Sequence, residues 1–225
     1  MGPPGSGDCE TRSELWGQPV LALSSLSYVL VGLLVLFWGL RRADVDRREA
    51  WLFAGGLVAA GLGSADYHGP AIGPEPLLHD GGLALALVVA FGIDLRTLGF
   101  PGSRVAGWLA AGTALMIGFI ALVPVASPAL AGVAAVGLVV TEVVIYRRGL
   151  RTPQPALWAG IAALALGVVV FSLSRTGGPW CQPDSWFQGH GVWHVLTAVS
   201  LGLWGYVSLP STVVEHAQSL PRVAS

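Results

Sequence analysis

Charged residues are scarce in this sequence, and lysine is absent altogether. Only 11% of the 225 residues are charged, 53% are hydrophobic and the mean hydropathy is +0.66. An ordinary soluble domain carries about 25% charged residues, so the composition excludes a water-soluble single domain. All twelve basic residues are Arg and the formal net charge is −1, which leaves no basic surface for nucleic acid.

Several catalytic and metal-binding motifs are also missing. The sequence has no GxSxG, no Walker-type Gly-rich loop and no HExxH, so a serine hydrolase, an NTPase and a gluzincin-like protease lack support. The two cysteines, Cys9 and Cys181, do not have the CxxC spacing of a zinc ribbon or a redox motif. They can form at most one bridge.

Long apolar tracts dominate what is present. Tracts of about 17 to 25 mostly apolar residues can cross a bilayer, and the sequence contains seven, at 20–40, 50–67, 77–95, 105–125, 129–146, 155–174 and 187–209. The N-terminal residues are acidic rather than basic, unlike a cleavable signal peptide. We therefore predict an all-α integral membrane protein, a seven-transmembrane helix bundle at 20–209, with an extracytoplasmic segment at 1–19 and a cytoplasmic tail at 210–225.

The arginines gather in alternate loops. Ten lie in the tail and in the loops after the first, third and fifth spans, whereas only Arg12 and Arg175 lie on the other side. The positive-inside rule then places the N-terminus outside and the C-terminus in the cytoplasm. Cys9 and Cys181 share the extracytoplasmic side, where a disulfide can persist; a bridge and two unpaired thiols are the alternatives. The abundance of Ala, Gly and Arg is typical of a GC-rich genome, and we expect a bacterial inner membrane.

A layer of polar residues falls at the outer ends of the second, third and seventh spans. Ionisable residues in membrane spans are costly and indicate function. His190 and His194 are four residues apart and share one helix face, and His68 adds a third imidazole from the second span. Three imidazoles that leave a fourth position open are typical of catalytic zinc. Histidines that hydrogen-bond to lipid or to neighbouring helices are the alternative.

Two further residues of this layer are candidates for catalysis. Asp80 is expected to orient a water molecule or accept its proton; the alternative is a cap at the start of the third span. Ser64, four residues before His68, has a helix-packing alternative. His79 is interpreted as an interfacial or supporting residue that points away from Asp80. Glu142 is expected to pair at the membrane interface with the adjacent Arg147 and Arg148.

The segments that carry these residues are GSADYH (63–68), LLHD (77–80) and GHGVWH (189–194). This pattern resembles the CREST superfamily of membrane hydrolases, which includes alkaline ceramidases, the adiponectin-receptor/hemolysin III group and Per1-like proteins. The N-terminal CE at 9–10 and QPVLALSSLSY at 18–28 look most like the alkaline ceramidase branch. The resemblance implies that zinc is bound by His68, His190 and His194, and that Ser64 and Asp80 complete the site.

The resemblance also implies features of the N-terminal segment. Alkaline ceramidases have cysteines at matching places, which implies a disulfide between Cys9 and Cys181. Their calcium site maps in part onto Asp8, Glu10 and Glu14, whose carboxylates suit a hard cation. The family's asparagine-containing segment is replaced here by LAL at 21–23.

The expected function is a zinc-dependent intramembrane lipid amide hydrolase, similar to a ceramidase. It would cleave an N-acyl lipid, ceramide or a similar one, into a fatty acid and an amine by a zinc-activated water. Two other classes remain open: a receptor-like or scaffolding membrane protein with structural zinc, and a metal or proton transporter. Transport needs polar stations through the whole membrane thickness, and the inner halves of the spans offer few.

Overall fold

The structure, a computed structural model, describes residues 7–73, 75–123 and 127–210. This part of the chain contains seven helices. They are α1 (Pro19–Leu40), α2 (Arg47–His68), α3 (Glu75–Thr97), α4 (Gly102–Leu122), α5 (Ser127–Arg147), α6 (Pro155–Leu173) and α7 (Gly189–Ser208). Each coincides with one predicted span to within a few residues, so the predicted all-α architecture is confirmed. Most of the predicted tail, 211–225, lies outside the described residues.

Five of these helices are long and apolar enough to cross a membrane: α1, α3, α4, α5 and α6. Their outer surfaces carry large exposed side chains, such as Leu30 on α1, Leu115 on α4 and Trp158 on α6. Apolar surface on this scale needs a lipid environment, which makes the chain a membrane protein. The two remaining helices, α2 and α7, are those that carry the predicted metal ligands.

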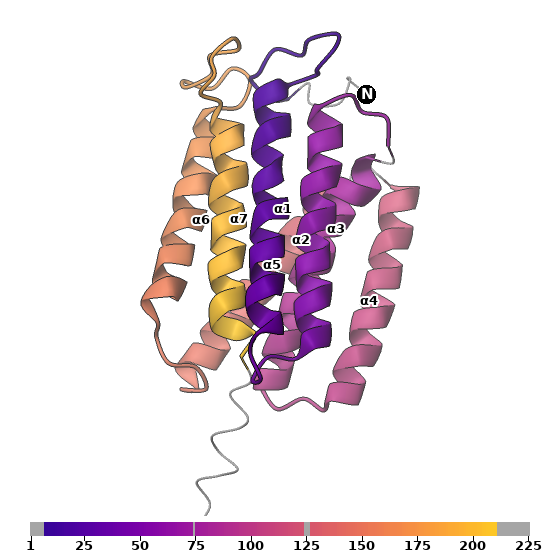
Figure 1. The fold of residues 1–225 in the computed structure, drawn as a ribbon, viewed down its shortest axis with the longest axis vertical. Helices are drawn as coiled ribbons and strands as arrows, with labels where there is room; N and C mark the ends of the chain where they lie inside the picture. Colours follow the sequence, from indigo (N-terminus) through magenta and orange to yellow (C-terminus); the bar gives the residue numbers. More distant parts are fainter. Residues whose placement is uncertain (1–6, 74, 124–126, 211–225) are drawn as a thin grey trace, which may run out of the picture.

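The helices form a bundle in which α1 lies between α2 and α7 (Figure 1). Helix α3 packs against α2, α4 and α5, and α6 packs against α7. The start of α1, the end of α2 and the start of α7 lie at one end of the bundle, beside the α6–α7 loop (Figure 1). This arrangement brings the polar residues of α1, α2 and α7 into one layer.

Small residues let α2 and α3 approach closely. A Cβ added to Gly63 would lie 2.3 Å from the backbone nitrogen of His79, and one added to Gly82 would lie 2.3 Å from that of Ala60. Backbones come this near only where side chains are missing, as at the small-residue contacts of membrane helices. The contact at Gly63 places the first turns of α3 directly beside the end of α2.

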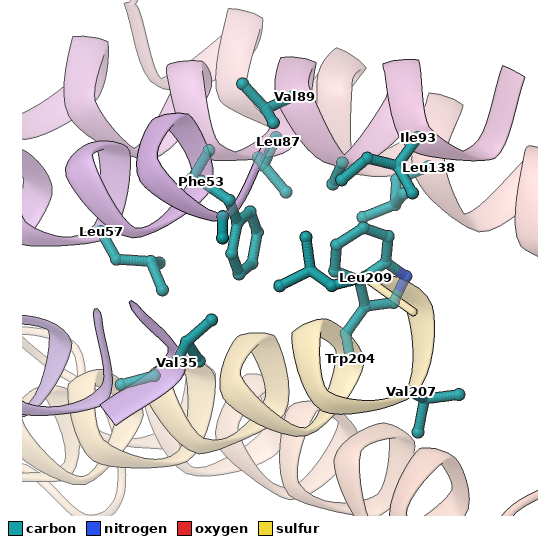
Figure 2. Close-up of a cluster of buried hydrophobic side chains, with 14 of the residues drawn as sticks. Val35, Phe53, Leu57, Leu87, Val89, Ile93, Leu138, Trp204, Val207 and Leu209 are labelled. Carbon is teal, nitrogen blue, oxygen red and sulfur yellow. The ribbon is translucent and has the colours of Figure 1, made fainter. Parts of the chain in front are cut away.

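The buried hydrophobic core lies toward the other end of the bundle. Phe53 and Leu57 of α2 contact a cluster to which α1, α3, α5 and α7 also contribute, including Val35, Ile93 and Leu209 (Figure 2). Phe53 and Leu57 are completely buried. The larger buried hydrophobic cluster therefore lies away from the polar layer, and a smaller one, of Ala84, Met116 and Ile120, lies between α3 and α4.

A buried charged group also lies at the apolar end, at the junction of α3, α5 and α7. We call it the Arg151 cluster; it comprises Asp94, Thr141, Glu142, Arg151 and Trp204. The Arg151 guanidinium donates to Glu142 at 2.5 Å and to Asp94 at 3.3 Å. Thr141 donates to Asp94 at 2.7 Å, and the Trp204 indole donates to Glu142.

The predicted pairing of Glu142 with Arg147 and Arg148 is therefore wrong. After α5 the chain turns back at Gly149. Its φ of +66° is readily adopted by glycine but strained for other residues. The turn brings Arg151 over the end of the helix, where it meets Glu142. Arg147 and Arg148 are exposed instead.

Candidate metal centre

Three histidines from two helices converge at the polar end of the bundle. His68 ends α2, whereas His190 and His194 lie in the first two turns of α7. One potential ligand atom from each lies within 4.8 Å of the others. The ring centroids of His190 and His194 are 4.5 Å apart, and that of His68 lies 5.0 and 5.3 Å from them. The structure thus brings together the three predicted ligands.

Each ring has a protein partner at its Nδ1 atom. The pairs are His68 with Gln18 Oε1 at 2.9 Å, His190 with Asp8 Oδ1 at 2.8 Å, and His194 with Ser24 Oγ at 3.0 Å. An amide oxygen and a carboxylate can only accept, so Nδ1 of His68 and of His190 carries the proton. The Ser24 hydroxyl donates to the carbonyl of Leu21 and so accepts from His194.

This protonation leaves Nε2 of each ring as a free acceptor. The Nε2 atoms of His68 and His194 are buried and have no hydrogen-bond partner. A buried polar atom without a partner costs about 1–3 kcal/mol, and two such atoms beside a third imidazole fit a metal ion. Metal-bound histidines commonly donate their other ring N–H to an oxygen, as all three do here.

Ser64 belongs to a chain of hydroxyl groups next to His194. Its Oγ lies 2.8 Å from that of Ser25, which in turn donates to the Leu21 carbonyl at 2.7 Å. Ser25 therefore accepts from Ser64, and the lone pairs of Ser64 remain available. The predicted residue is buried and next to the histidines, and it bonds to a hydroxyl of α1 rather than to a backbone carbonyl.

Sequence reasoning missed three of the supporting residues. Gln18, Ser24 and Ser25 come from the start of α1, and Gln18 and Ser25 are buried almost completely. The signal was present, since polar residues interrupt an otherwise apolar helix within QPVLALSSLSY. Which groups of α2 and α7 these polar residues contact, however, depends on how the three helices pack.

Asp80 lies inside α3, which begins five residues earlier at Glu75. The alternative interpretation as a helix cap is therefore wrong. Its carboxylate bonds to Nδ1 of His79 at 2.6 Å, so the expectation that His79 points away is also wrong. The His79 ring stacks on Tyr67 with centroids 5.3 Å apart and lies 6.2 Å from the ring of His68. Asp80 thus contacts the histidine that lies next to His68 in space.

The three N-terminal acidic residues have separate surroundings. Asp8 contacts His190 and accepts from Arg175 at 2.6 Å, while Glu10 caps α1 by accepting from the backbone N–H groups of Val20 and Leu21 at 2.8 and 2.9 Å. The Glu14 residue is exposed. Among the described residues these carboxylates form no shared ligand group.

The pKa values of Asp8 and Glu10 shift in opposite net directions, although burial raises both. Burial raises the pKa of Asp8, but the hydrogen bond from His190 and the favourable electrostatic interactions with His190, His68 and Arg175 outweigh it and hold the pKa below its ordinary value. Burial raises the pKa of Glu10 above 4.5 despite its two backbone hydrogen bonds. Asp8 is therefore the more strongly ionised carboxylate beside the histidines.

The cysteines tie the N-terminal segment to the α6–α7 loop. Cys9 and Cys181 lie at disulfide distance, with their Cα atoms 5.4 Å apart. Thr11 continues the contact through a backbone hydrogen bond to Pro183 at 3.1 Å. The segment that carries Asp8 is thus held next to the loop that leads into α7.

Comparison with known proteins does not assign the chain. No protein-family model matches it, and no curated protein is significantly similar to it in sequence.

Proposed function

We propose that the protein is a zinc-dependent intramembrane hydrolase that cleaves the amide bond of an N-acyl lipid such as ceramide. The observation that carries the proposal is the pair of buried Nε2 atoms, on His68 and His194, that face the third histidine without a hydrogen-bond partner. Three imidazoles are the ligand set of catalytic zinc sites with an open position. The motifs at 63–68, 77–80 and 189–194 resemble those of the CREST superfamily, which supports the same assignment.

Zinc bound there would act as a Lewis acid and lower the pKa of a water molecule toward about 7. Ser64 offers an acceptor to that water, because its own proton is directed at Ser25. Asp80 is the proposed proton carrier, and His79 holds its carboxylate. The water oxygen bonds to the carbonyl carbon, the C–N bond breaks, and the proton taken up by Asp80 passes to the leaving amine.

All seven helices are proposed to cross the membrane, with the N-terminus outside. Helices α2 and α7 are less apolar than the others, but each packs between or against more apolar neighbours. Arginines are concentrated in the loops at the end of the bundle away from the histidines, which the positive-inside rule places in the cytoplasm. The site then lies near the extracytoplasmic face, within reach of lipid substrates.

The first experiment measures zinc per chain in protein purified without added metal, by elemental analysis. We expect about one zinc in the wild type and a marked loss in His194→Ala. His79→Gln is the matched control, since it removes a nearby histidine outside the ligand set, and it should retain zinc. Wild-type protein that stays folded but takes up no zinc when it is offered would overturn the proposal.

The second experiment tests the reaction. Zinc-loaded protein is incubated with a panel of labelled N-acyl lipids and their ester counterparts, and the release of fatty acid is measured. Asp80→Asn should keep its zinc and lose activity by at least about 100-fold, the usual contribution of a positioned acid or base. Zinc binding without hydrolysis of any lipid would favour a structural zinc in a receptor-like or scaffolding protein.

A further inference from the structure

We propose that Asp8 positions His190 for metal binding and that the Cys9–Cys181 connection keeps Asp8 in place. This inference rests on the proposed function in that zinc is the ion concerned. The N-terminal segment then serves the metal centre directly, through one carboxylate, rather than through a calcium ion.

The geometry around His190 gives this role to Asp8. His190 is the most exposed of the three histidines, with 13% of its side chain accessible, whereas the Asp8 side chain is only 5% accessible. The Asp8 Oδ1 atom accepts from His190 Nδ1 at 2.8 Å. Its other oxygen lies 3.7 Å from Nδ1 of His68, so the carboxylate is close to two of the three ligands.

His190 has few other polar contacts to fix its ring. The edge of Phe171 packs against it, with centroids 4.9 Å apart, but an aromatic contact leaves rotation about the ring axis open. A carboxylate that accepts from Nδ1 selects the tautomer with a free Nε2 and raises its basicity. Asp8 is therefore the residue that directs the His190 Nε2 atom toward the other two ligands.

Arg175 supplies the positive charge that Asp8 needs. Its guanidinium donates to the same Oδ1 atom at 2.6 Å and lies over the face of Phe171, 5.0 Å from the ring centroid. A buried carboxylate is costly unless it is paired, and the nearby arginine provides that pairing within the protein. The Asp8 carboxylate is thus paired by a side chain of the same chain.

The backbone around Asp8 is fastened to the α6–α7 loop. Asp8 and Arg175 form an isolated antiparallel bridge, and the Thr176 hydroxyl donates to the Asp8 carbonyl at 2.9 Å. Cys9, the next residue, lies at disulfide distance from Cys181. The bond adds a covalent link to the hydrogen bonds and to the Asp8–Arg175 ion pair that hold the N-terminal segment.

The experiment measures zinc affinity by competition with a chromophoric chelator, so it does not depend on hydrolytic activity. We expect Asp8→Ala to raise the zinc Kd about 10–100-fold, the usual effect of removing such a partner. Asp8→Asn, which keeps an acceptor oxygen but loses the charge, should give an intermediate Kd. Asp184→Asn removes an exposed carboxylate from the same loop region, where it accepts from the Thr11 hydroxyl at 3.2 Å, and should leave the Kd unchanged.

The connection is tested by a double-mutant cycle. The double variant Cys9→Ser/Cys181→Ser should weaken zinc binding when Asp8 is present. In the Asp8→Ala background it should weaken binding little further, because both changes remove the positioning of His190 by Asp8. The absorption bands of Co²⁺-substituted protein provide a second readout, and they should shift in Asp8→Ala if the ligand geometry loosens.

The outcomes separate this inference from the proposed function. A wild type that binds zinc, together with an Asp8→Ala variant whose Kd and cobalt spectrum match it, would refute the role of Asp8 and leave the metal centre standing. A wild type that binds no zinc would refute both. If the cysteine changes lower zinc affinity by the same factor with and without Asp8, the proposed role of the disulfide in holding Asp8 is refuted.

Discussion

Asp94 and Arg151 are buried together 3.3 Å apart, although 57 residues separate them in the sequence. Arg151 also pairs with Glu142, so one guanidinium serves two carboxylates at the junction of α3 and α5. The Trp204 indole extends this contact to α7. The Arg151 cluster therefore connects three helices that share few other polar contacts among the described residues.

Arg151→Ala should destabilise the folded bundle strongly. Removal of one partner of a buried ion pair typically costs about 3–5 kcal/mol, because the remaining charges stay buried without compensation. Thermal unfolding in detergent, followed by circular dichroism, measures the change. Arg148→Ala removes the same charge from an exposed position three residues earlier and should alter the midpoint little; equal midpoints for the two variants would contradict the prediction.

Gly63→Ala should destabilise the protein by about 1–3 kcal/mol, the usual cost of overpacking. The added Cβ would meet the His79 backbone at 2.3 Å, and backbone cannot give way as a side chain can. Gly55→Ala on the same helix is the matched control, because its Cβ would meet nothing within 4 Å. The control should stabilise the helix by about 0.5–1 kcal/mol. Unfolding midpoints that move in the same direction would argue against the close contact of α2 and α3.

Gln18→Ala should weaken zinc binding about 10–100-fold. Gln18 accepts from Nδ1 of His68, and its removal leaves that imidazole free to rotate or to change tautomer. The measurement is the zinc Kd from chelator competition. Gln182→Ala, an exposed position in the α6–α7 loop, should bind zinc as the wild type does. A Kd that is unaffected by Gln18→Ala would show that α2 alone fixes His68.

Ser64→Ala should slow hydrolysis while leaving zinc content near one per chain. Its lone pairs are the acceptor proposed to orient the attacking water, so kcat should fall by up to about tenfold, the effect of losing one hydrogen bond of about 0.5–1.5 kcal/mol. Ser25→Ala should have a smaller effect, because Ser64 then keeps its lone pairs and loses only the partner of its proton. Loss of zinc in Ser64→Ala would instead indicate a role in packing around His194.

The seven helices could be predicted from the sequence because each one coincides with a long apolar tract, and five are apolar enough to cross a membrane. All three candidate ligands could also be placed, since the order of the predicted spans puts the end of α2 and the start of α7 in one layer. What could not be predicted depends on side-chain contacts between segments far apart in sequence. Gln18 and Ser24 support the histidines only because α1 packs between α2 and α7.

An incorrect expectation for Glu142 and an incorrect alternative for Asp80 have similar causes. Glu142 was paired with the nearest arginines in the sequence, but the turn at Gly149 brings Arg151 closer in space. Asp80 resembled a cap because its surroundings become apolar only after it, but α3 starts earlier at Glu75. Local sequence patterns do not show where a chain folds back or where a helix gains an extra turn.

The residues of the metal centre come from widely separated parts of the chain, and this has a consequence for biosynthesis. Gln18 and Ser24 emerge from the ribosome early, whereas His190 and His194 belong to the last helix that the structure describes. Until that helix is inserted, a nascent chain has only one of the three ligands, His68. Under the proposed function, zinc uptake therefore has to follow the synthesis of α7, and a chain that stalls before α7 lacks two of the three proposed ligands.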